Sequence, residues 1–223
     1  MIKAVIFDMY ETLITHYKSP LYFGAHMAKD AEIPEEKFYP LWRGLDYDRT
    51  IGKLTLEELL ERILRENDCY SKALLNELVT KRVATKEECF RHLHIEIIPM
   101  LSKLKESGSL VGLISNCYVE EAKVIRKSEL FPFFDSAYLS CELGIAKPDV
   151  EIFERCMKEM GVKPEECLYI GDGGSRELET ATALGMKAVQ AVWYLQEGTT
   201  QTSRRMVNFL QAETPLEVLN YLE

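Results

Sequence analysis

Several residues of this chain that suit covalent chemistry stand directly after short apolar stretches. Asp8, Ser115 and Asp172 each end such a stretch, and Lys147 stands just before a proline that opens a helical pattern. A carboxylate can attack an electrophilic centre and form a covalent intermediate, so Asp8 is a candidate nucleophile. Parallel strands place their carboxyl ends along one edge of a sheet. The four side chains are therefore predicted to meet in one crevice.

Each of these residues also has an ordinary structural interpretation. Asp172 suits the N-cap of a following helix, and Ser115 with Asn116 suits a capping turn. Lys147 suits a solvated loop, where most lysines lie. The common placement of the set at strand ends is more specific than any single member. It favours one shared site over four separate structural roles.

Five short apolar runs, rich in β-branched residues and bounded by turn residues, predict buried strands. Helical patterns separate the later runs, which is typical of βαβ units and a parallel sheet. The predicted strands are 3–7, 110–115, 136–139, 167–171 and 187–192, the helices between them are about 118–128, 149–160 and 175–184, and a closing helix follows Thr214 and Pro215.

The region from about residue 16 to residue 95 breaks the alternation, because its patterns are helical throughout. An insertion directly after the strand that carries Asp8 lies over the edge of the sheet, where a lid would exclude water from a reaction. A helical subdomain that only thickens the fold is the alternative. The predicted domains are a core at 1–15 and 96–223 and a helical cap at 16–95, with cap helices at about 20–31, 35–49, 55–66 and 71–93.

The composition is that of an acidic globular protein, with 223 residues and a formal net charge of −9. This charge disfavours nucleic acid or an anionic membrane as partners. An anionic small molecule then needs a locally positive pocket or a metal. The six cysteines form no CxxC pair, no secretory signal is evident, and no apolar run reaches the roughly 20 residues of a membrane span. We expect a cytoplasmic protein, and the sequence does not indicate its oligomeric state.

The order and placement of these residues resemble the four motifs of the haloacid dehalogenase-like (HAD) hydrolase superfamily, and the helical insertion is similar to the cap of its subclass I. The resemblance covers nearly the whole chain. It implies an α/β fold, in which a Rossmann-like core with a parallel sheet flanked by helices carries an inserted helical cap domain.

The resemblance also implies roles in covalent catalysis. Asp8 matches the nucleophile, and Thr12 matches the threonine of the first motif. Ser115, followed by Asn116, matches the hydroxyl of the second motif that holds the transferring group. Lys147 matches the lysine of the third motif. A lysine there neutralises phosphate charge and keeps the nucleophilic carboxylate ionised.

A magnesium site is implied by the same resemblance. Asp172 matches the first acid of the fourth motif, and Glu177 stands where many members have the second. Mg²⁺ prefers an octahedral set of oxygen ligands that includes water. The expected ligands are Asp8, the backbone carbonyl of Tyr10 and Asp172, with Glu177 either bound directly or one shell further out.

Tyr10 departs from the pattern of HAD phosphatases, most of which carry an aspartate two residues after the nucleophile. That aspartate protonates the leaving alcohol and then activates water. A phenol, with a reference pKa of about 10, can donate a proton but is a poor base at neutral pH. Tyrosine at this position resembles the 2-haloacid dehalogenases, which use no metal. Glu11 is a nearby carboxylate whose side chain is expected to point away from Asp8.

Two arginines of the insertion are candidates for substrate contact. The stretch 41–43, which ends in Arg43, resembles the segment that carries the halide- and carboxylate-binding arginine of dehalogenases. The alternative is a solvated arginine on an amphipathic helix, paired with nearby acids. Arg49 is an equal candidate.

These observations predict a Mg²⁺-dependent phosphatase or phosphotransferase that acts on a small phosphorylated metabolite through an aspartyl intermediate at Asp8, with an altered proton route. A dehalogenase-type hydrolase, suggested by Tyr10, is one alternative. A catalytically weak HAD-like binding protein is the other. The sequence does not identify the substrate.

Overall fold

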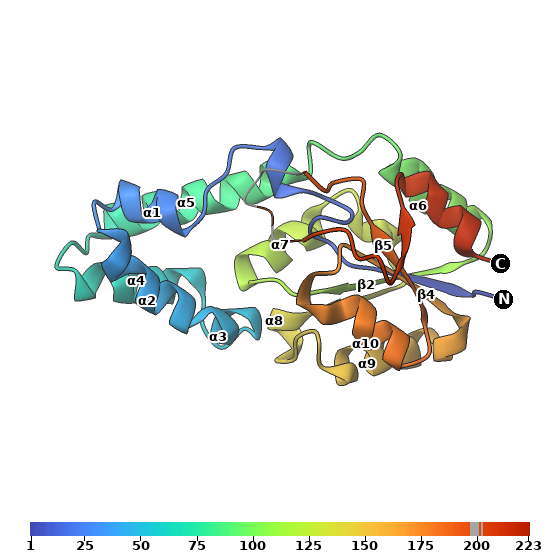
Figure 1. Cartoon of the computed structure of the whole chain (residues 1–223). Coiled ribbons are helices and arrows are strands. Elements are labelled where there is room, and N and C mark those ends of the chain that lie inside the picture. The colour runs from blue at the N-terminus through green and yellow to red at the C-terminus, as the bar shows by residue number, and fades with distance from the viewer. Residues whose placement is uncertain (197–200, 202) are drawn as a thin grey trace.

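Short runs of buried apolar residues form a six-stranded parallel sheet in the part of the chain that the computed structural model describes, residues 1–196, 201 and 203–223. The strands are β1 (Ala4–Phe7), β2 (Leu110–Ser115), β3 (Ser136–Leu139), β4 (Cys167–Gly171), β5 (Lys187–Ala191) and β6 (Leu210–Ala212). Their order across the sheet is β3-β2-β1-β4-β5-β6 (Figure 1). Because β1 lies between β2 and β4, the carboxyl ends of these three strands are neighbours.

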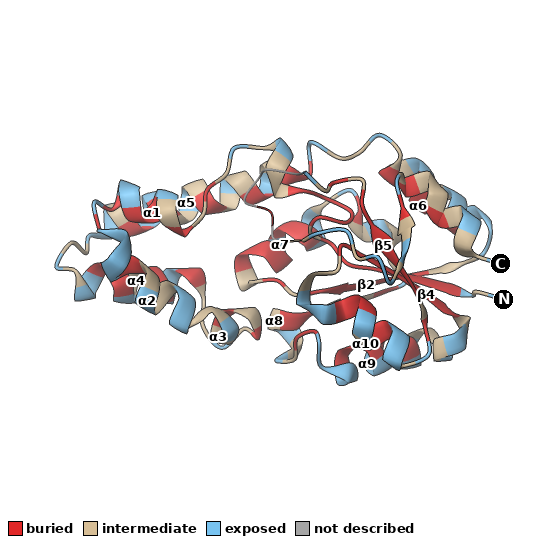
Figure 2. Cartoon of the chain, in the orientation of Figure 1, coloured by how far each residue is buried: buried red, intermediate tan, exposed pale blue. Residues whose placement is uncertain are grey.

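Helices cover both faces of the sheet. They are α6 (Ile97–Glu106), α7 (Val119–Lys127), α8 (Ser140–Leu143), α9 (Val150–Met160), α10 (Glu177–Ala183) and the 3₁₀ helix η5 (Pro215–Tyr221). Successive strand side chains point to opposite faces. Val5 and Phe7 therefore pack with α6 and α7, whereas Ile6 packs with α9 and α10. Figure 2 shows the buried strands between helices whose outer sides are exposed.

A second lobe consists of helices and has an apolar core of its own (Figure 1). Its helices are α1 (Gly24–Asp30), α2 (Glu35–Gly44), α3 (Asp46–Thr50), α4 (Leu56–Glu66) and α5 (Lys72–Cys89). Leu59 and Leu78 are among its fully buried residues. The end of α5 joins the other lobe, since Cys89 and Phe90 pack in the core under the sheet. The boundaries of the predicted cap, 16 and 95, stay a prediction.

The α/β fold with a parallel sheet is confirmed, and some element bounds differ from those predicted. The helix expected at 35–49 is divided at Leu45, whose φ of −108° and ψ of 11° leave helical geometry. The closing helix is a 3₁₀ helix. The patterns did not predict α6, α8 or β6. The last two have four and three residues, too few for a periodic pattern.

Among the described residues, no helix combines the length and the apolar character that crossing a membrane requires.

Candidate active site

Lys147 lies between two buried carboxylates at the carboxyl edge of the sheet. Its Nζ donates to Asp8 Oδ1 at 2.7 Å and also to Glu177 Oε2. The Tyr169 hydroxyl donates to the same Glu177 oxygen at 3.0 Å. Burial opposes the charge of Lys147, but the nearby Asp8 and Glu177 raise the pKa of its ammonium above the usual value. Lys147 is therefore a fixed positive charge beside Asp8.

Asp172 completes a cluster of three acids with Asp8 and Glu177. One carboxylate oxygen from each lies within 4.8 Å of the others, and all three residues are buried. Burial, and then the charge of Asp8, raise the pKa of Asp172 to about 6. Burial likewise raises the pKa of Glu177 to about 8, against the opposing charge of Lys147. Repulsion among the acids adds to the effect of burial on both pKa values, and a bound divalent cation would offset that repulsion.

The donor set suits a hard cation, because carboxylate oxygens are what Mg²⁺ prefers. Glu177 differs from the other two acids in its partners. Its Oε2 accepts from Lys147 and Tyr169, and its Oε1 accepts from the backbone N–H of Gly173 at 3.3 Å. Glu177 is also fully buried, whereas Asp8 and Asp172 keep 7% and 6% exposure. A fully buried acid held by Lys147 fits a supporting role better than that of a direct ligand.

Two glycines let Glu177 reach the cluster. A Cβ on Gly171 would stand 2.0 Å from Glu177 Oε1, so a side chain there would displace the carboxylate. Gly173 has a φ of +95°, which glycine adopts readily, and Asp172 Oδ1 accepts from the next N–H, that of Gly174, at 2.8 Å. The loop after β4 is therefore shaped around the acids.

Three hydroxyl groups near the cluster are buried and have no hydrogen-bond partner within the described part of the chain: those of Tyr10, Thr12 and Ser115. A buried hydroxyl without a partner costs free energy, so these groups are suited to receive a ligand oxygen. Asn116 lies differently, because its side chain is bonded to the Lys147 backbone: Nδ2 donates to the carbonyl at 2.9 Å and Oδ1 accepts from the N–H at 2.8 Å. Asn116 thus fixes the backbone of Lys147.

Tyr10 stacks on His16, with ring centroids 4.7 Å apart and an interplanar angle of 10°. Burial, followed by the charge of Glu121, raises the pKa of the Tyr10 phenol well above its usual value. Glu11 has a left-handed φ of 59°, and its carboxylate accepts from Thr15 Oγ1 at 2.5 Å and contacts His16 Nδ1 at 2.9 Å. Glu11 is therefore held toward the residues that follow it in the chain.

The two candidate arginines lie in different surroundings. Arg43 is exposed, with its guanidinium 4.4 Å from the Tyr39 ring, and it does not line a cavity near the acids. Arg49 is fully buried, 3.8 Å from the Tyr118 ring centroid, and donates to Glu120 Oε1 at 2.8 Å. The structure brings Arg49 to the junction of the lobes and leaves Arg43 outside it, and Arg49 also lines neither of the two cavities beside Lys147.

Two further cations of the helical lobe, Arg82 and Lys86 on α5, were not predicted. Arg82 Nη2 lies 3.2 Å and Lys86 Nζ 2.6 Å from Glu121 Oε1. Burial by itself opposes the charge of Glu121, but Lys86 and Arg82 lower its pKa to about 2. The spacing of four residues places both cations on one face of α5. That spacing, together with the acidic pair at positions 120 and 121, is the feature of the sequence that could have indicated these two cations.

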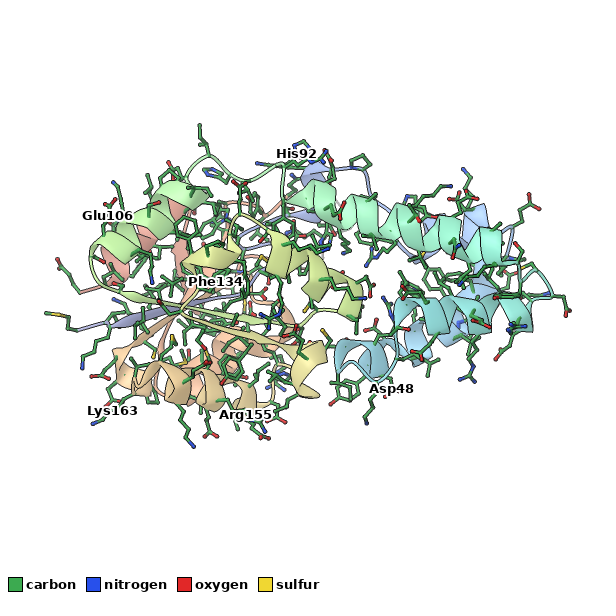
Figure 3. The ribbon with its side chains drawn as sticks, turned by 180° about the vertical axis from the view of Figure 1, so that it is seen from behind. Asp48, His92, Glu106, Phe134, Arg155 and Lys163 are labelled. Carbon is green, nitrogen blue, oxygen red and sulfur yellow. The ribbon has the colours of Figure 1, made fainter. Side chains whose placement is uncertain are left out.

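Two cavities meet beside Lys147. One of about 380 Å³ contains Asp8 and the other acids of the cluster, and one of about 520 Å³ reaches between the lobes to Lys86. Figure 3 shows α3, marked by Asp48, where the helical lobe meets the lobe that carries the sheet. Residues that line both cavities are Tyr10, His16, Phe23, Asn116, Lys147 and Ser175.

The segment after β5 also reaches the acids, although the polar composition of 201–205 is typical of a surface loop. Ser203 Oγ donates to Asp172 Oδ2, and Gln201 is buried. Gln190 on β5 fastens the segment, since its Nε2 donates to the Asp172 carbonyl at 2.8 Å and to the Arg204 carbonyl at 2.7 Å. The polar composition of the segment hid this contact. Thr202 lies outside the described residues.

A model of a protein family, described as haloacid dehalogenase-like hydrolase, matches residues 2–185. That span covers most of the chain, including every motif described above. The chain belongs to the haloacid dehalogenase-like hydrolase family. It is a HAD-like enzyme, as the resemblance of its motifs implied.

Individual relatives carry different names. The chain is 27% identical over 204 residues, 85% of its length and 84% of the relative, to the glyceraldehyde 3-phosphate phosphatase of Methanopyrus kandleri. Among solved structures, a HAD family enzyme of Bacteroides thetaiotaomicron matches with a TM-score of 0.68 and 22% identity, over 90% of this chain and 97% of that one. The Bacteroides enzyme has also been solved in complex with magnesium and inorganic phosphate.

A 2-haloacid dehalogenase of Pseudomonas syringae has an equal TM-score of 0.68, with 21% identity over 99% of this chain and 97% of that one. Since phosphatases and dehalogenases share this fold, the structural likeness alone does not separate the two reactions.

Proposed function

We propose that the protein is a Mg²⁺-dependent phosphatase that hydrolyses a small phosphorylated metabolite through an aspartyl phosphate at Asp8. The observation that carries this proposal is the buried cluster of Asp8, Asp172 and Glu177, with Lys147 bonded to two of its members. Three acids in one buried place are costly unless a cation is shared among them. The phosphatase names of several relatives support the same chemistry.

In this proposal Asp8, Asp172 and the backbone carbonyl of Tyr10 hold Mg²⁺, and Glu177 supports them from behind through Lys147. The bound ion would neutralise and orient the oxygens of the transferring phosphoryl group. The free carboxylate oxygen of Asp8 attacks phosphorus. Because Lys147 is a cation bonded to the other oxygen, it keeps Asp8 ionised for that attack.

The hydroxyls of Thr12 and Ser115 are assigned to the phosphoryl oxygens, because both are buried and lack a partner among the described residues. Lys147 contributes its charge to the same oxygens, and Asn116 keeps the Lys147 backbone in place. Preorganised donors of this kind stabilise the charge of a transition state without having to reorganise. The free cysteines of the described chain support the expected cytoplasmic location.

A second candidate, a hydrolase that acts on carbon such as a 2-haloacid dehalogenase, is favoured by Tyr10. Tyr10 lines both cavities, and its buried phenol lacks a hydrogen-bond partner among the described residues. A dehalogenase needs no metal, so this reaction gives no reason for Glu177 to lie beside Asp8 and Asp172.

The test is hydrolysis of a panel of phosphate esters with Mg²⁺ and with EDTA, alongside chloride release from 2-chloropropionate. We expect phosphate release that EDTA abolishes and that Asp8→Asn reduces by at least about 10³-fold, since the covalent step is lost. Asp68→Asn makes the same chemical change at an exposed carboxylate of the helical lobe and serves as the control. Chloride release that persists in EDTA, without phosphate release, would refute the phosphatase.

A further inference from the structure

The carboxylates that line the two cavities are all held by neighbouring groups, at least among the described residues. Glu11 is bonded to Thr15 and His16, and Asp46 accepts from the Tyr118 hydroxyl at 2.6 Å. The others bond to partners described above. The carboxylates concerned are Asp8, Glu11, Asp46, Glu121, Asp172 and Glu177. No carboxylic acid of this set is left to protonate a leaving group.

The remaining groups between the cavities are poor acids or are already engaged. The Tyr10 hydroxyl lacks a partner, but a phenol with a reference pKa of about 10 gives up its proton much less readily than a carboxylic acid. Both ring nitrogens of His16 are occupied, Nδ1 by Glu11 at 2.9 Å and Nε2 by Lys86. Lys86, whose pKa burial lowers to about 8, is bonded to Glu121 and His16. Among the described residues, the site can therefore donate a hydrogen bond to a leaving oxygen but has no free carboxylic acid to protonate it.

Positive charge lines the larger cavity instead. Arg82 and Lys86 share the single carboxylate of Glu121, which balances only one of their two positive charges. Arg82 Nε is buried and has no partner in the described structure. Lys147 lines the same cavity from the other side. Cations that line a cavity stabilise an anion that forms there.

We infer that the enzyme is specialised for phosphoryl donors whose leaving group departs as a stable anion, namely acyl phosphates, phosphoanhydrides and aryl phosphates. The inference rests on the proposed phosphatase function and names its substrate class. The leaving group lies in the larger cavity near Arg82 and Lys86, while the phosphoryl group lies over Asp8.

The first step requires no proton transfer. The bond from Asp8 Oδ to phosphorus forms, the bond from phosphorus to the leaving oxygen breaks, and the electron pair departs with that oxygen as a carboxylate, phosphate or phenolate. In the second step water attacks the aspartyl phosphate, the acyl phosphate bond breaks, Asp8 leaves as a carboxylate, and both hydrogens of the water leave with dihydrogen phosphate. Since Tyr10 is a poor base for that water, the second step is slower than the first.

The experiment compares kcat/KM for acetyl phosphate, a series of aryl phosphates and glycerol phosphate, all with Mg²⁺. kcat/KM reports the steps up to release of the leaving group. General acid catalysis contributes about 10²–10⁴-fold, so we expect acetyl phosphate to exceed glycerol phosphate by at least about 10²-fold. The aryl series should show a steep decline as the leaving group becomes more basic.

Tyr10→Asp restores a carboxylic acid, and we expect the ratio of acetyl to glycerol phosphate to fall by at least about tenfold in this variant. Tyr10→Phe, which removes only the hydroxyl, should retain the wild-type preference. If Tyr10→Asp does not fold, the wild-type aryl series tests the inference: a steep decline with leaving-group basicity supports it, and a flat series overturns it. A wild-type enzyme that hydrolyses glycerol phosphate within about tenfold of acetyl phosphate overturns the inference and leaves the phosphatase intact. No hydrolysis of any phosphate would instead remove the proposed function.

Discussion

At the scale of single residues, the placement of the acids depends on close approaches that a sequence does not display. The convergence of Asp8, Ser115, Lys147 and Asp172 could be predicted, because parallel strands bring their ends together. The partners of Glu177 could not, because they depend on Gly171 leaving space for the carboxylate. The roles of these residues remain proposals that single substitutions can test.

Gly171→Ala should weaken magnesium binding without removing any acid. The added methyl group would occupy the place of Glu177 Oε1, so this carboxylate would lose its contact with Lys147. Loss of such outer-shell support lowers metal affinity by about 10–100-fold. Calorimetric titration with Mg²⁺ measures the affinity. Gly44→Ala, where no atom lies within 4 Å of the new methyl, is the matched control. Equal Mg²⁺ affinity in both variants would contradict the supporting role.

The pH dependence of stability should carry the signature of Asp172 in the metal-free protein. Its pKa is raised to about 6, against about 3.9 in an unfolded chain. The folded state therefore binds more protons between these values, and the contribution of Asp172 to stability falls as pH rises through that window. This contribution amounts to up to about 3 kcal/mol.

The measurement is urea unfolding in EDTA at several pH values, for the wild type and for Asp172→Asn. Because the variant lacks the titrating acid, the unfolding free energy of the wild type minus that of the variant should decrease from about pH 4 to pH 7. A difference that stays constant over this range would show that Asp172 is not perturbed as described.

At the scale of elements, the periodic patterns predicted five strands and most of the helices, each close to its observed position. What they could not predict are contacts between elements distant in the sequence. The pairing of α5 with α7 is an example, since it joins Arg82 and Lys86 to Glu121 across the two lobes. Helical periodicity predicts which face of its helix a residue lies on, but the element that packs against this face depends on the tertiary structure.

Glu121→Gln should destabilise the junction of the lobes strongly. Arg82 and Lys86 would keep their buried charges and lose the carboxylate that compensates them, which costs about 3–5 kcal/mol. Urea unfolding measures the loss. The control, Glu151→Gln, breaks an exposed pair with Arg155 (Figure 3) and should cost less than about 1 kcal/mol. Similar costs for the two variants would show that the junction does not depend on the buried charges.

At the scale of the whole molecule, an acidic chain with a net charge of −9 concentrates buried cations where its two lobes meet. The helical lobe has its own apolar core and contacts the sheet-bearing lobe through α3 with α8 and α5 with α7. The larger cavity lies between these contacts. Under the proposed function, these cations would attract an anionic substrate to the cavity although the chain as a whole is acidic.

The central claim is that Asp8 carries the phosphoryl group during turnover. The direct measurement is mass spectrometry of the protein after brief reaction with acetyl phosphate and Mg²⁺ and an acid quench. Because we expect Tyr10 to make hydrolysis of the intermediate slow, one phosphoryl group should be found on the peptide that contains Asp8, and Asp8→Asn should carry none. Steady phosphate release with no phosphoryl group on Asp8, or with the group on another residue, would contradict the account.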